Sequence, residues 1–345
     1  MSRLKEIARF GQQIWLDNLT RQLLERGTLA HWIAEDGIAG VTSNPAIFHN
    51  AIKSDPGYRN DLARIKRDIP QPEMRFEALV LPDIRRACDL LRPVHDTFRG
   101  QAGFVSFEVS PGLAHDAAGT IAAARRLWQA IDRPNAMIKI PATPAGMEAI
   151  TEVIAAGINV NATLIFGPTQ LAAVQAAHHK GLEKRAAQGE SVREIASVAS
   201  VFISRIDTLL DPRLPPELRG KVAIASARDA YARWRDLPPP PRGAMPQKLL
   251  WASTSGKNPA YRDVLYVEEL IGSDTVNTVP DATLAAFRDH GVATASLVAH
   301  SGETQTILKD LRATGIDLDR VGETLLFAGL EQFEESFASL LELVN

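Results

Sequence analysis

The chain has little that would link it to an oxidising compartment, a membrane or a nucleic acid. Its 345 residues include one cysteine, Cys88, so a disulfide within the chain is impossible. No run approaches the roughly 18 apolar residues of a membrane span, and the opening MSRLKEIARFGQQIW lacks the apolar core of a signal peptide. The 38 Lys and Arg residues nearly balance 41 Asp and Glu residues, for a net charge of −3. We therefore expect a cytoplasmic protein that binds neither nucleic acid nor a membrane.

Several cofactor motifs are also missing. The sequence contains no GxGxxG and no GxxxxGK[ST], so it offers no fingerprint for a dinucleotide or a P-loop nucleotide. It contains no HExxH and no cluster of Cys and His with the spacing of metal ligands. The pair His178 and His179 lies in a helical segment, and we expect both at the surface. We therefore expect no cofactor and no metal.

What the sequence does contain is a regular alternation of apolar runs and helical segments. Eight runs of the kind found in buried parallel strands cover residues 12–17, 38–44, 103–109, 136–142, 159–166, 195–204, 248–254 and 274–280. Helical periodicity covers 18–34, two segments across 46–97, 115–132, 145–156, 169–188, 223–235, 258–271 and 281–289, then 301–314 and 320–343. Eight such units without a nucleotide fingerprint favour a (β/α)₈ TIM barrel over a doubly wound sheet.

The length fits one barrel with helical additions. A (β/α)₈ barrel takes about 250 residues, so we expect a single domain over 1–345, with the barrel at about 12–290 and a C-terminal helical extension at about 300–345. The proline run at 238–242 is expected to be a stiff surface loop. The last helix, at 322–345, has an apolar stripe that suits packing on the barrel or on a second subunit. We favour the barrel, and a homodimer stays open.

Polar residues at the carboxyl ends of the strands are the candidates for chemistry, because active sites of this fold lie there. These residues are Asp17, Asn44, Glu108, Lys139, Asn161, Thr163, Ser200, Arg205, Ser253, Ser255 and Lys257. Lys139 differs from the others because Met137, Ile138, Ile140 and Pro141 surround it. Burial favours a neutral amine, which attacks carbonyl carbons to form a Schiff base. An ammonium paired with a carboxylate inside the barrel is an equally good explanation.

Two carboxylates share this end of the predicted barrel. Asp17 closes the first strand and Glu108 lies in the third. A Schiff-base lysine needs groups that move protons among hydroxyls, carbinolamine and water, and two carboxylates in one dry site can divide that work. Asp17 is also a candidate N-cap of the first helix. Glu108 is also a candidate ion-pair partner of Lys139, which is compatible with catalysis.

Six segments resemble transaldolase motifs in order and spacing, over residues 12 to about 284. They are WLDNLTR (15–21), GVTSNPAIF (40–48), IKIPATPAGMEAI (138–150), GINVNATLIFG (157–167), VASVFISRID (198–207) and SGKNPAYRDVLYVEELIG (255–272). They are most similar to the longer bacterial and plant-type branch. The resemblance implies that Lys139 forms the Schiff base and that Asp17 deprotonates the C4 hydroxyl of the donor. It implies that Glu108 and Thr163 hold the water used to form and hydrolyse the imine.

The same resemblance implies a set of substrate-binding residues. They are Asn44, Asn161, Ser200, Phe202, Arg205, Ser255 and Lys257. Asn44, Asn161 and Ser200 are expected to hydrogen-bond the donor hydroxyls, and Arg205 to bind the phosphate. Many relatives use a second arginine there, where this chain has Lys257. Because lysine binds phosphate as a point charge, that half of the phosphate site is expected to differ in geometry. Asn44 could instead belong only to a turn before Pro45.

The implied activity is transfer of a dihydroxyacetone unit in the non-oxidative pentose phosphate pathway. The donors and acceptors are sedoheptulose 7-phosphate with glyceraldehyde 3-phosphate and, in reverse, fructose 6-phosphate with erythrose 4-phosphate. The main alternative is fructose 6-phosphate aldolase, whose members typically carry Gln and Tyr where this chain has Glu108 and Phe202. Phe202 alone would be explained by core packing. A catalytically silent barrel that binds sugar phosphates is a further alternative, which the intact Asp17, Glu108 and Lys139 disfavour.

Overall fold

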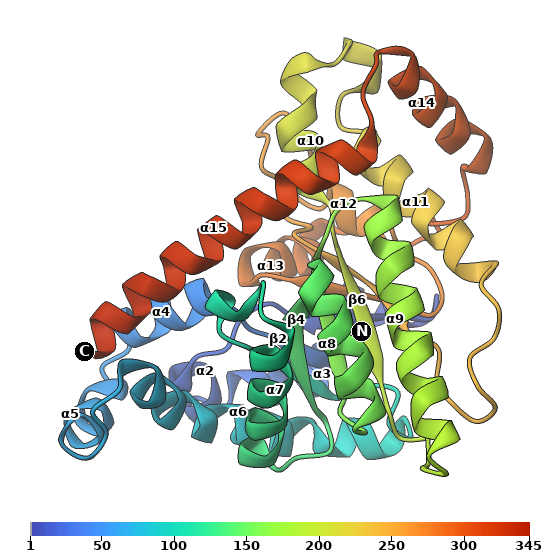
Figure 1. Ribbon diagram of the computed structural model, residues 1–345. Helices are drawn as coiled ribbons and strands as arrows, with labels where there is room; N and C mark the ends of the chain where they lie inside the picture. Colours follow the sequence, from blue (N-terminus) through green and yellow to red (C-terminus); the bar gives the residue numbers. More distant parts are fainter. Residues whose placement is uncertain (1) are drawn as a thin grey trace.

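The computed structural model describes residues 2–345 and contains a closed barrel of parallel strands (Figure 1). Each strand pairs with the next in the sequence, and the eighth pairs with the first. The strands are β1 (Gln12–Leu16), β2 (Ile38–Thr42), β3 (Phe104–Glu108), β4 (Ala136–Pro141), β5 (Val160–Ile165), β6 (Ser197–Phe202), β7 (Lys248–Ala252) and β8 (Thr275–Val279). Each lies within one of the eight apolar runs, so the predicted TIM barrel is confirmed.

Helices surround the barrel (Figure 1). Those of the first half are α1 (Arg3–Ala8), α2 (Arg21–Glu25), α3 (Thr28–Asp36), α4 (Pro45–Ser54), α5 (Tyr58–Asp68), α6 (Pro72–Thr97), α7 (Ala117–Ile131) and α8 (Pro144–Ala155). Those of the second half are α9 (Pro168–Ala187), α10 (Ser204–Leu210), α11 (Val222–Arg235), α12 (Leu265–Glu268), α13 (Asp281–His290), α14 (Ser301–Ala313) and α15 (Leu318–Val344). Short 3₁₀ turns cover η1 (Pro111–Leu113), η2 (Asp211–Arg213) and η3 (Pro216–Leu218). No helix among residues 2–345 is long and apolar enough to cross a bilayer.

Three helical predictions were wrong in detail. The segment 18–34 is two helices, because Gly27 adopts a left-handed φ of 70° between them. The region 46–97 holds three helices instead of two. Of the segment 258–271 only α12 is helical, since its first half, which contains Pro259, forms a loop after β7. Neither α1 nor α10 was expected from the periodicity.

Short-range sequence signals fix the starts of the helices that follow the strands. Asn44 caps α4 by accepting a hydrogen bond from the backbone N–H of Ile47, and Pro45 occupies the first turn. Thr143 caps α8 in the same way, through the N–H of Gly146. A Cβ at Gly146 would lie 1.9 Å from the carbonyl oxygen of Pro141, so only glycine fits there. These turns bring the ends of β2 and β4 into a defined position.

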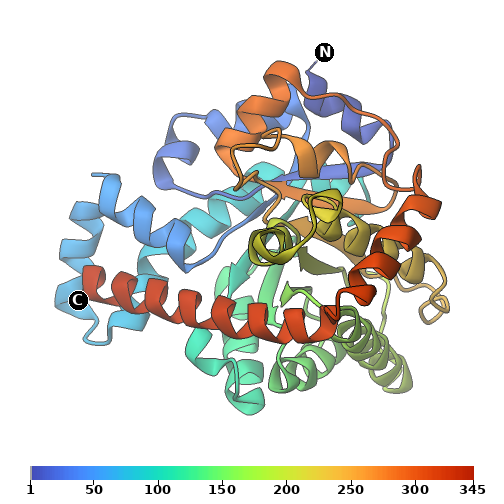
Figure 2. The same ribbon diagram turned by 90° about the horizontal axis from the view of Figure 1, so that it is seen from above.

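Helix α15 crosses the face of the barrel, as the view from above shows (Figure 2). It contacts β5, α4, α6 and α9, and its apolar stripe is buried. The preferred prediction, that this stripe packs on the barrel, is therefore confirmed. Gly322 and Gly329 allow the close approach, because a Cβ at Gly322 would lie 2.8 Å from the backbone nitrogen of Gly167.

Candidate active site

A cavity of about 230 Å³ lies among the carboxyl ends of the strands. It is lined by Asp17, Thr42, Asn44, Lys139, Thr163, Ser200, Phe202, Arg205, Ala252, Ser253, Ser255, Lys257, Thr278, Pro280 and Phe333. The structure thus brings together every candidate site residue proposed from the sequence except Glu108 and Asn161, which lie next to the lining.

Lys139 lies on β4 with its side chain in the barrel, where it is 5% exposed. Its Nζ donates hydrogen bonds to the backbone oxygen of Ser43 at 3.2 Å and to Oε2 of Glu108 at 3.3 Å. The ring of Phe333 lies on a further side, with its centroid 5.6 Å from Nζ. Three elements from distant parts of the chain therefore hold the amine at the edge of the cavity.

Glu108 ends β3 directly beside Lys139, because the two residues are register partners in neighbouring strands. Its side chain is 7% exposed. Burial raises the pKa of the Glu108 carboxyl, and the charge and hydrogen bond of Lys139 oppose that rise. The ion pair considered from the sequence is therefore present. A carboxyl with a raised pKa next to an amine is suited to accept and return a proton.

Asp17 follows β1 and faces the cavity. Its Oδ1 accepts a hydrogen bond of 2.7 Å from Oγ1 of Thr42, which also hydrogen-bonds Oγ1 of Thr278 at 2.7 Å. Burial raises the pKa of Asp17, while the charge of Lys139 is the largest of the effects that lower it. Asp17 does not cap the first helix after β1, because Thr20 caps α2. The carboxylate is thus free for chemistry.

Thr163 lies on β5 where the strand is irregular. The register between β5 and β6 shifts after Ala162, and Leu164 adopts a positive φ of 58°. Thr163 lines the cavity, and its Oγ1 is buried and has no hydrogen-bond partner among residues 2–345. A buried hydroxyl without a protein partner is costly, so this position suits a group that a ligand or water satisfies.

Asn161 lies one layer deeper and is fully buried. Its Nδ2 donates to Oγ of Ser106 at 3.0 Å, and its Oδ1 accepts from Oγ of Ser200 at 2.7 Å. Ser200 itself lines the cavity. The structure therefore places Asn161 behind Ser200, where it fixes the orientation of that hydroxyl.

Asn44 serves both of the uses considered from the sequence. Its Oδ1 caps α4, and the residue lines the cavity. The preceding Ser43 donates through Oγ to the backbone oxygen of Ser106 at 2.9 Å. The turn that begins α4 thus also forms one wall of the site.

The basic side of the cavity contains Arg205 and Lys257. Arg205 lies on α10 directly after β6, with its Cζ 5.6 Å from the ring centroid of Phe202. One guanidinium nitrogen donates to Oε1 of Gln332 at 2.7 Å. Arg205 forms no ion pair within residues 2–345, and burial lowers the pKa of its guanidinium. A half-buried cation without a carboxylate partner is suited to bind an anion.

Three lining residues with polar or aromatic side chains were not among the site residues predicted from the sequence: Thr42, Thr278 and Phe333. The two threonines lie at or next to the ends of β2 and β8, so the rule that selected the others could have found them. Phe333 comes from α15, and its position in an apolar stripe gave no sign of what the stripe would face. Within the described chain, no group of three or more His, Cys, Asp or Glu residues is placed to hold a metal ion.

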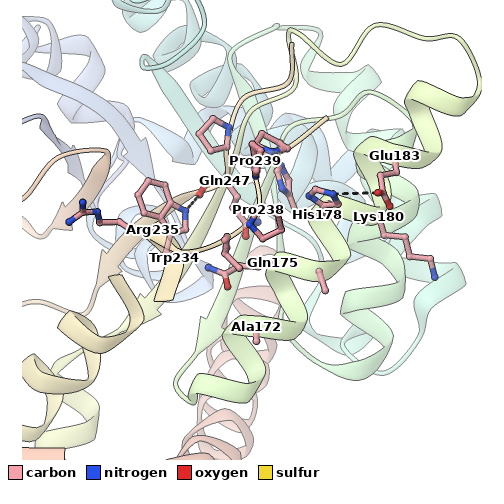
Figure 3. A pocket seen from close by; sticks show the side chains of 15 residues that line it. Ala172, Gln175, His178, Lys180, Glu183, Trp234, Arg235, Pro238, Pro239 and Gln247 are labelled. Carbon is pink, nitrogen blue, oxygen red and sulfur yellow. Dashed lines mark hydrogen bonds and ion pairs between the residues drawn. The ribbon is translucent and has the colours of Figure 1, made fainter. Parts of the chain in front are cut away.

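A second cavity, of about 750 Å³, lies outside the barrel between α9 and the loop 236–247 (Figure 3). Trp234 donates from its indole nitrogen to the backbone oxygen of Gln247 at 2.6 Å, and the charged ends of Lys180 and Arg235 point away from the centre. This cavity is larger, but the one ion pair that the described chain forms among its lining residues joins His179 to Glu183 on α9, and both side chains are partly or largely exposed. The buried amine beside a carboxylate, Lys139 with Glu108, lies at the strand ends, which makes the cavity there the candidate active site.

His178 borders this outer cavity, and the expectation that it lies at the surface was wrong. It is 4% exposed instead of lying at the surface, because the loop 236–247 folds over α9. Burial lowers the pKa of His178 to about 4, so the imidazole is neutral near pH 7. His179, its neighbour, is partly exposed and lies 3.4 Å from Glu183.

Known proteins resemble this chain over nearly its whole length. The family model described as Transaldolase/Fructose-6-phosphate aldolase matches residues 14–344. A transaldolase of Thiobacillus denitrificans is 49% identical over 355 residues, covering 99% of both chains. A transaldolase of Neisseria gonorrhoeae is 49% identical over 348 residues, again covering 99% of both. A protein named Transaldolase 2 of Nostoc punctiforme is 43% identical, covering 99% of this chain and 96% of its own.

Among solved structures, a fructose-bisphosphate aldolase of Campylobacter jejuni matches with a TM-score of 0.33 and 12% identity, covering 98% of this chain and 92% of that one. That likeness supports no conclusion about activity. The full-length relatives do: the resemblance seen in the motifs is confirmed, as are the transaldolase function and the enzyme class predicted from it. The chain therefore belongs to the transaldolase/fructose-6-phosphate aldolase family.

Proposed function

We propose that the chain transfers a dihydroxyacetone unit from sedoheptulose 7-phosphate to glyceraldehyde 3-phosphate and, in reverse, from fructose 6-phosphate to erythrose 4-phosphate, in the non-oxidative pentose phosphate pathway. One observation carries the proposal: the buried amine of Lys139 lies 3.3 Å from the Glu108 carboxylate, in a cavity that also contains Asp17 and Arg205. The family membership supports sugar phosphates as the substrates.

The first step is formation of the Schiff base. Glu108 takes a proton from Lys139, and the free amine adds to the C2 carbonyl of the donor ketose. The carbinolamine then loses water to give the iminium ion, with the oxygen leaving as water after protonation. We assign Glu108 as the donor of this proton, because its raised pKa suits both acceptance and return of a proton. We propose that the departing water is held by the hydroxyl of Thr163, which has no hydrogen-bond partner among residues 2–345.

The second step is cleavage of the C3–C4 bond. Asp17 accepts the proton of the C4 hydroxyl, the C4 carbonyl forms, and the bonding electrons pass to C3 and into the iminium. The aldose leaves, and the three-carbon enamine stays on Lys139. The hydrogen bond from Thr42 and the charges of Lys139 and Lys257 keep Asp17 able to ionise despite its burial. Reversal of the step with a new aldose completes the transfer.

Binding is assigned to the remaining lining residues. Arg205 binds the phosphate, because it is a cation without a carboxylate partner within residues 2–345. Lys257 and Ser255, which line the same cavity, assist it. Asn44 and Ser200 bind donor hydroxyls. Asn161 acts through Ser200, whose hydroxyl it orients.

Transfer is favoured over aldol cleavage by two residues. Glu108 is a carboxylate where the aldolases of the family typically have Gln, and Phe202 places a ring without a hydroxyl on the cavity wall. The relatives named above are transaldolases. One domain over 1–345 is our proposal as well, supported by the contribution of α15 to the cavity. The homodimer and the cytoplasmic location stay predictions.

The proposal is tested by product analysis. Fructose 6-phosphate with erythrose 4-phosphate should give sedoheptulose 7-phosphate, and fructose 6-phosphate alone should give little free dihydroxyacetone. Rapid release of dihydroxyacetone without an acceptor would assign the aldolase reaction instead, and no reaction at all would support a silent barrel.

Borohydride reduction with fructose 6-phosphate should attach the label to Lys139. Label on another lysine would refute the assignment. Asp17→Asn should still form the imine with dihydroxyacetone but cleave the ketose phosphate slowly, whereas normal cleavage would remove Asp17 from the mechanism.

A further inference from the structure

Two adjacent side chains of α15 reach the two chemical centres of the cavity. Oε1 of Gln332 accepts a hydrogen bond of 2.7 Å from Arg205, 127 residues away in the sequence. The ring of Phe333 lies over the Nζ of Lys139, with 5.6 Å to its centroid. The C-terminal helix therefore contacts both the proposed phosphate-binding cation and the proposed nucleophile.

The position of α15 over the cavity is fixed by contacts along its length. At its start, the Asp319 carboxylate accepts hydrogen bonds from the N–H and hydroxyl of Thr169 at 2.9 and 2.7 Å. In its middle, a Cβ at Gly329 would lie 3.1 Å from the Leu164 side chain, so the helix is close to β5. At its end, Leu340 and Val344 are fully buried. The helix thus holds its side chains at a defined depth.

Gln332 orients Arg205 without neutralising it. The Cζ of Arg205 lies 5.6 Å from the centroid of the Phe202 ring, and Arg205 lines the cavity. A neutral amide oxygen restricts the rotamers of this long side chain while leaving its full charge for an anion, whereas a carboxylate would compete with phosphate.

Phe333 covers the amine on a side that Glu108 and Ser43 leave open. Its side chain is 7% exposed, and it lines the cavity. The face of an aromatic ring attracts a cation, and the iminium formed on Lys139 is cationic. An apolar ring at this place also limits access of water to C2 of the bound three-carbon unit.

We propose that Gln332 and Phe333 are positioning residues of the active site: Gln332 sets the orientation of Arg205 for phosphate, and Phe333 keeps water from the iminium, so that the bound unit is transferred to an aldose instead of being hydrolysed. Hydrolysis begins when C3 of the enamine takes up a proton, such as the one that Asp17 accepted during cleavage, which gives the iminium ion. Water then adds to C2, a proton passes from the added water to the nitrogen of Lys139, the C2–N bond breaks, and dihydroxyacetone leaves. This inference rests on the proposed function.

The role of Phe333 is tested by the fraction of the bound three-carbon intermediate that is hydrolysed instead of transferred. Phe333→Ala should raise the ratio of dihydroxyacetone released from fructose 6-phosphate alone to product transferred to erythrose 4-phosphate by about fivefold. Phe333→Leu, which keeps an apolar side chain, should lie between this variant and wild type. Phe327→Ala is the matched control, because Phe327 lies on the same helix and is 65% exposed. An unchanged ratio in Phe333→Leu and Phe333→Ala would overturn this role.

Gln332 is tested by the KM of the acceptor. Gln332→Ala should raise the KM for erythrose 4-phosphate about tenfold, with kcat and the KM for unphosphorylated erythrose little changed. Gln332→Glu should also raise that KM, because the carboxylate neutralises Arg205 although it holds the side chain. Glu331→Ala, on an exposed neighbour, should behave as wild type. Equal effects on both acceptors, or full activity of Gln332→Glu, would overturn the role.

Different results would contradict the proposed function and the proposed role of α15. If wild-type protein transfers no dihydroxyacetone unit, the proposed function is wrong. If wild type transfers the unit and the α15 variants, shown to be folded by their thermal unfolding, keep its partition ratio and its KM, only the role of α15 is wrong.

Discussion

The hydrogen bond from Thr42 to Asp17 should control the pH range in which the enzyme cleaves its donor. Thr42 Oγ1 donates to Asp17 Oδ1 at 2.7 Å; Thr42 is buried and Asp17 is partly buried. Valine has nearly the same shape as threonine, so Thr42→Val removes the donor and leaves the packing. The change therefore isolates one interaction with the proposed base.

The size of the effect follows from the energy of a hydrogen bond to a charged group, about 1.5–3 kcal/mol. Since one pKa unit corresponds to about 1.4 kcal/mol, loss of the donor should raise the pKa of Asp17 by about 1–2 units. Burial has already raised this pKa, and Thr42 opposes that rise, so the variant shifts it further in the same direction. Asp17 must be ionised to accept the C4 proton, so less of the enzyme is active at low pH.

The assay is the pH dependence of kcat/KM for fructose 6-phosphate with erythrose 4-phosphate. The acidic limb of Thr42→Val should move upward by about 1–2 pH units, with activity recovering at higher pH. Thr42→Ser keeps the donor and should keep the wild-type limb. Thr278→Val should have little effect, because the bond from Thr42 to Asp17 persists. A uniformly lower rate with an unmoved limb in Thr42→Val would refute the reasoning.

Three further predictions concern imine chemistry and stability. Thr163→Val should slow imine formation, measured by rapid quenching with borohydride, and should not lower the melting temperature, because the hydroxyl has no protein partner within residues 2–345. A lower melting temperature with normal imine formation would contradict this prediction. Burial raises the pKa of Asp207 to about 7, above its ordinary value of 3.8. The stability that this group contributes is therefore full below about pH 4 and falls by up to about 4 kcal/mol as the pH rises to about 7, above which no more is lost. Asp207→Asn should flatten this loss, measured by urea unfolding at about pH 4.5 and 8.5, and an equally steep loss would refute the reasoning. Gly146→Ala should lower the free energy of unfolding by about 3 kcal/mol or more, because the new Cβ would lie 1.9 Å from the Pro141 carbonyl oxygen. In the same unfolding experiment Gly302→Ala should leave this free energy unchanged or raise it, because a Cβ at Gly302 would meet nothing within 4 Å.

The sequence determined the barrel and the centre of the site. Buried parallel strands must be apolar on both faces, so the eight runs were visible without any knowledge of their pairing. Lys139 stood out because an ammonium is costly among residues such as Ile138 and Ile140. The carboxyl ends of barrel strands meet at one face, which was enough to group Asp17 and Glu108 with the lysine before any distance was known.

Only the tertiary structure decided which side chains complete that site. Helical periodicity shows that α15 has an apolar face but not what the face covers, so Phe333 and Gln332 were invisible until the helix was placed over β5. The hydrogen bond from Thr42 to Asp17, which follows another strand, and the burial of His178 beside the distant loop 236–247 likewise depend on the tertiary structure. The sequence shows strands and helices through their periods of 2.0 and 3.6 residues, which involve only neighbouring residues. The contacts named here join segments that are far apart in the chain, so they exist only once the barrel has closed.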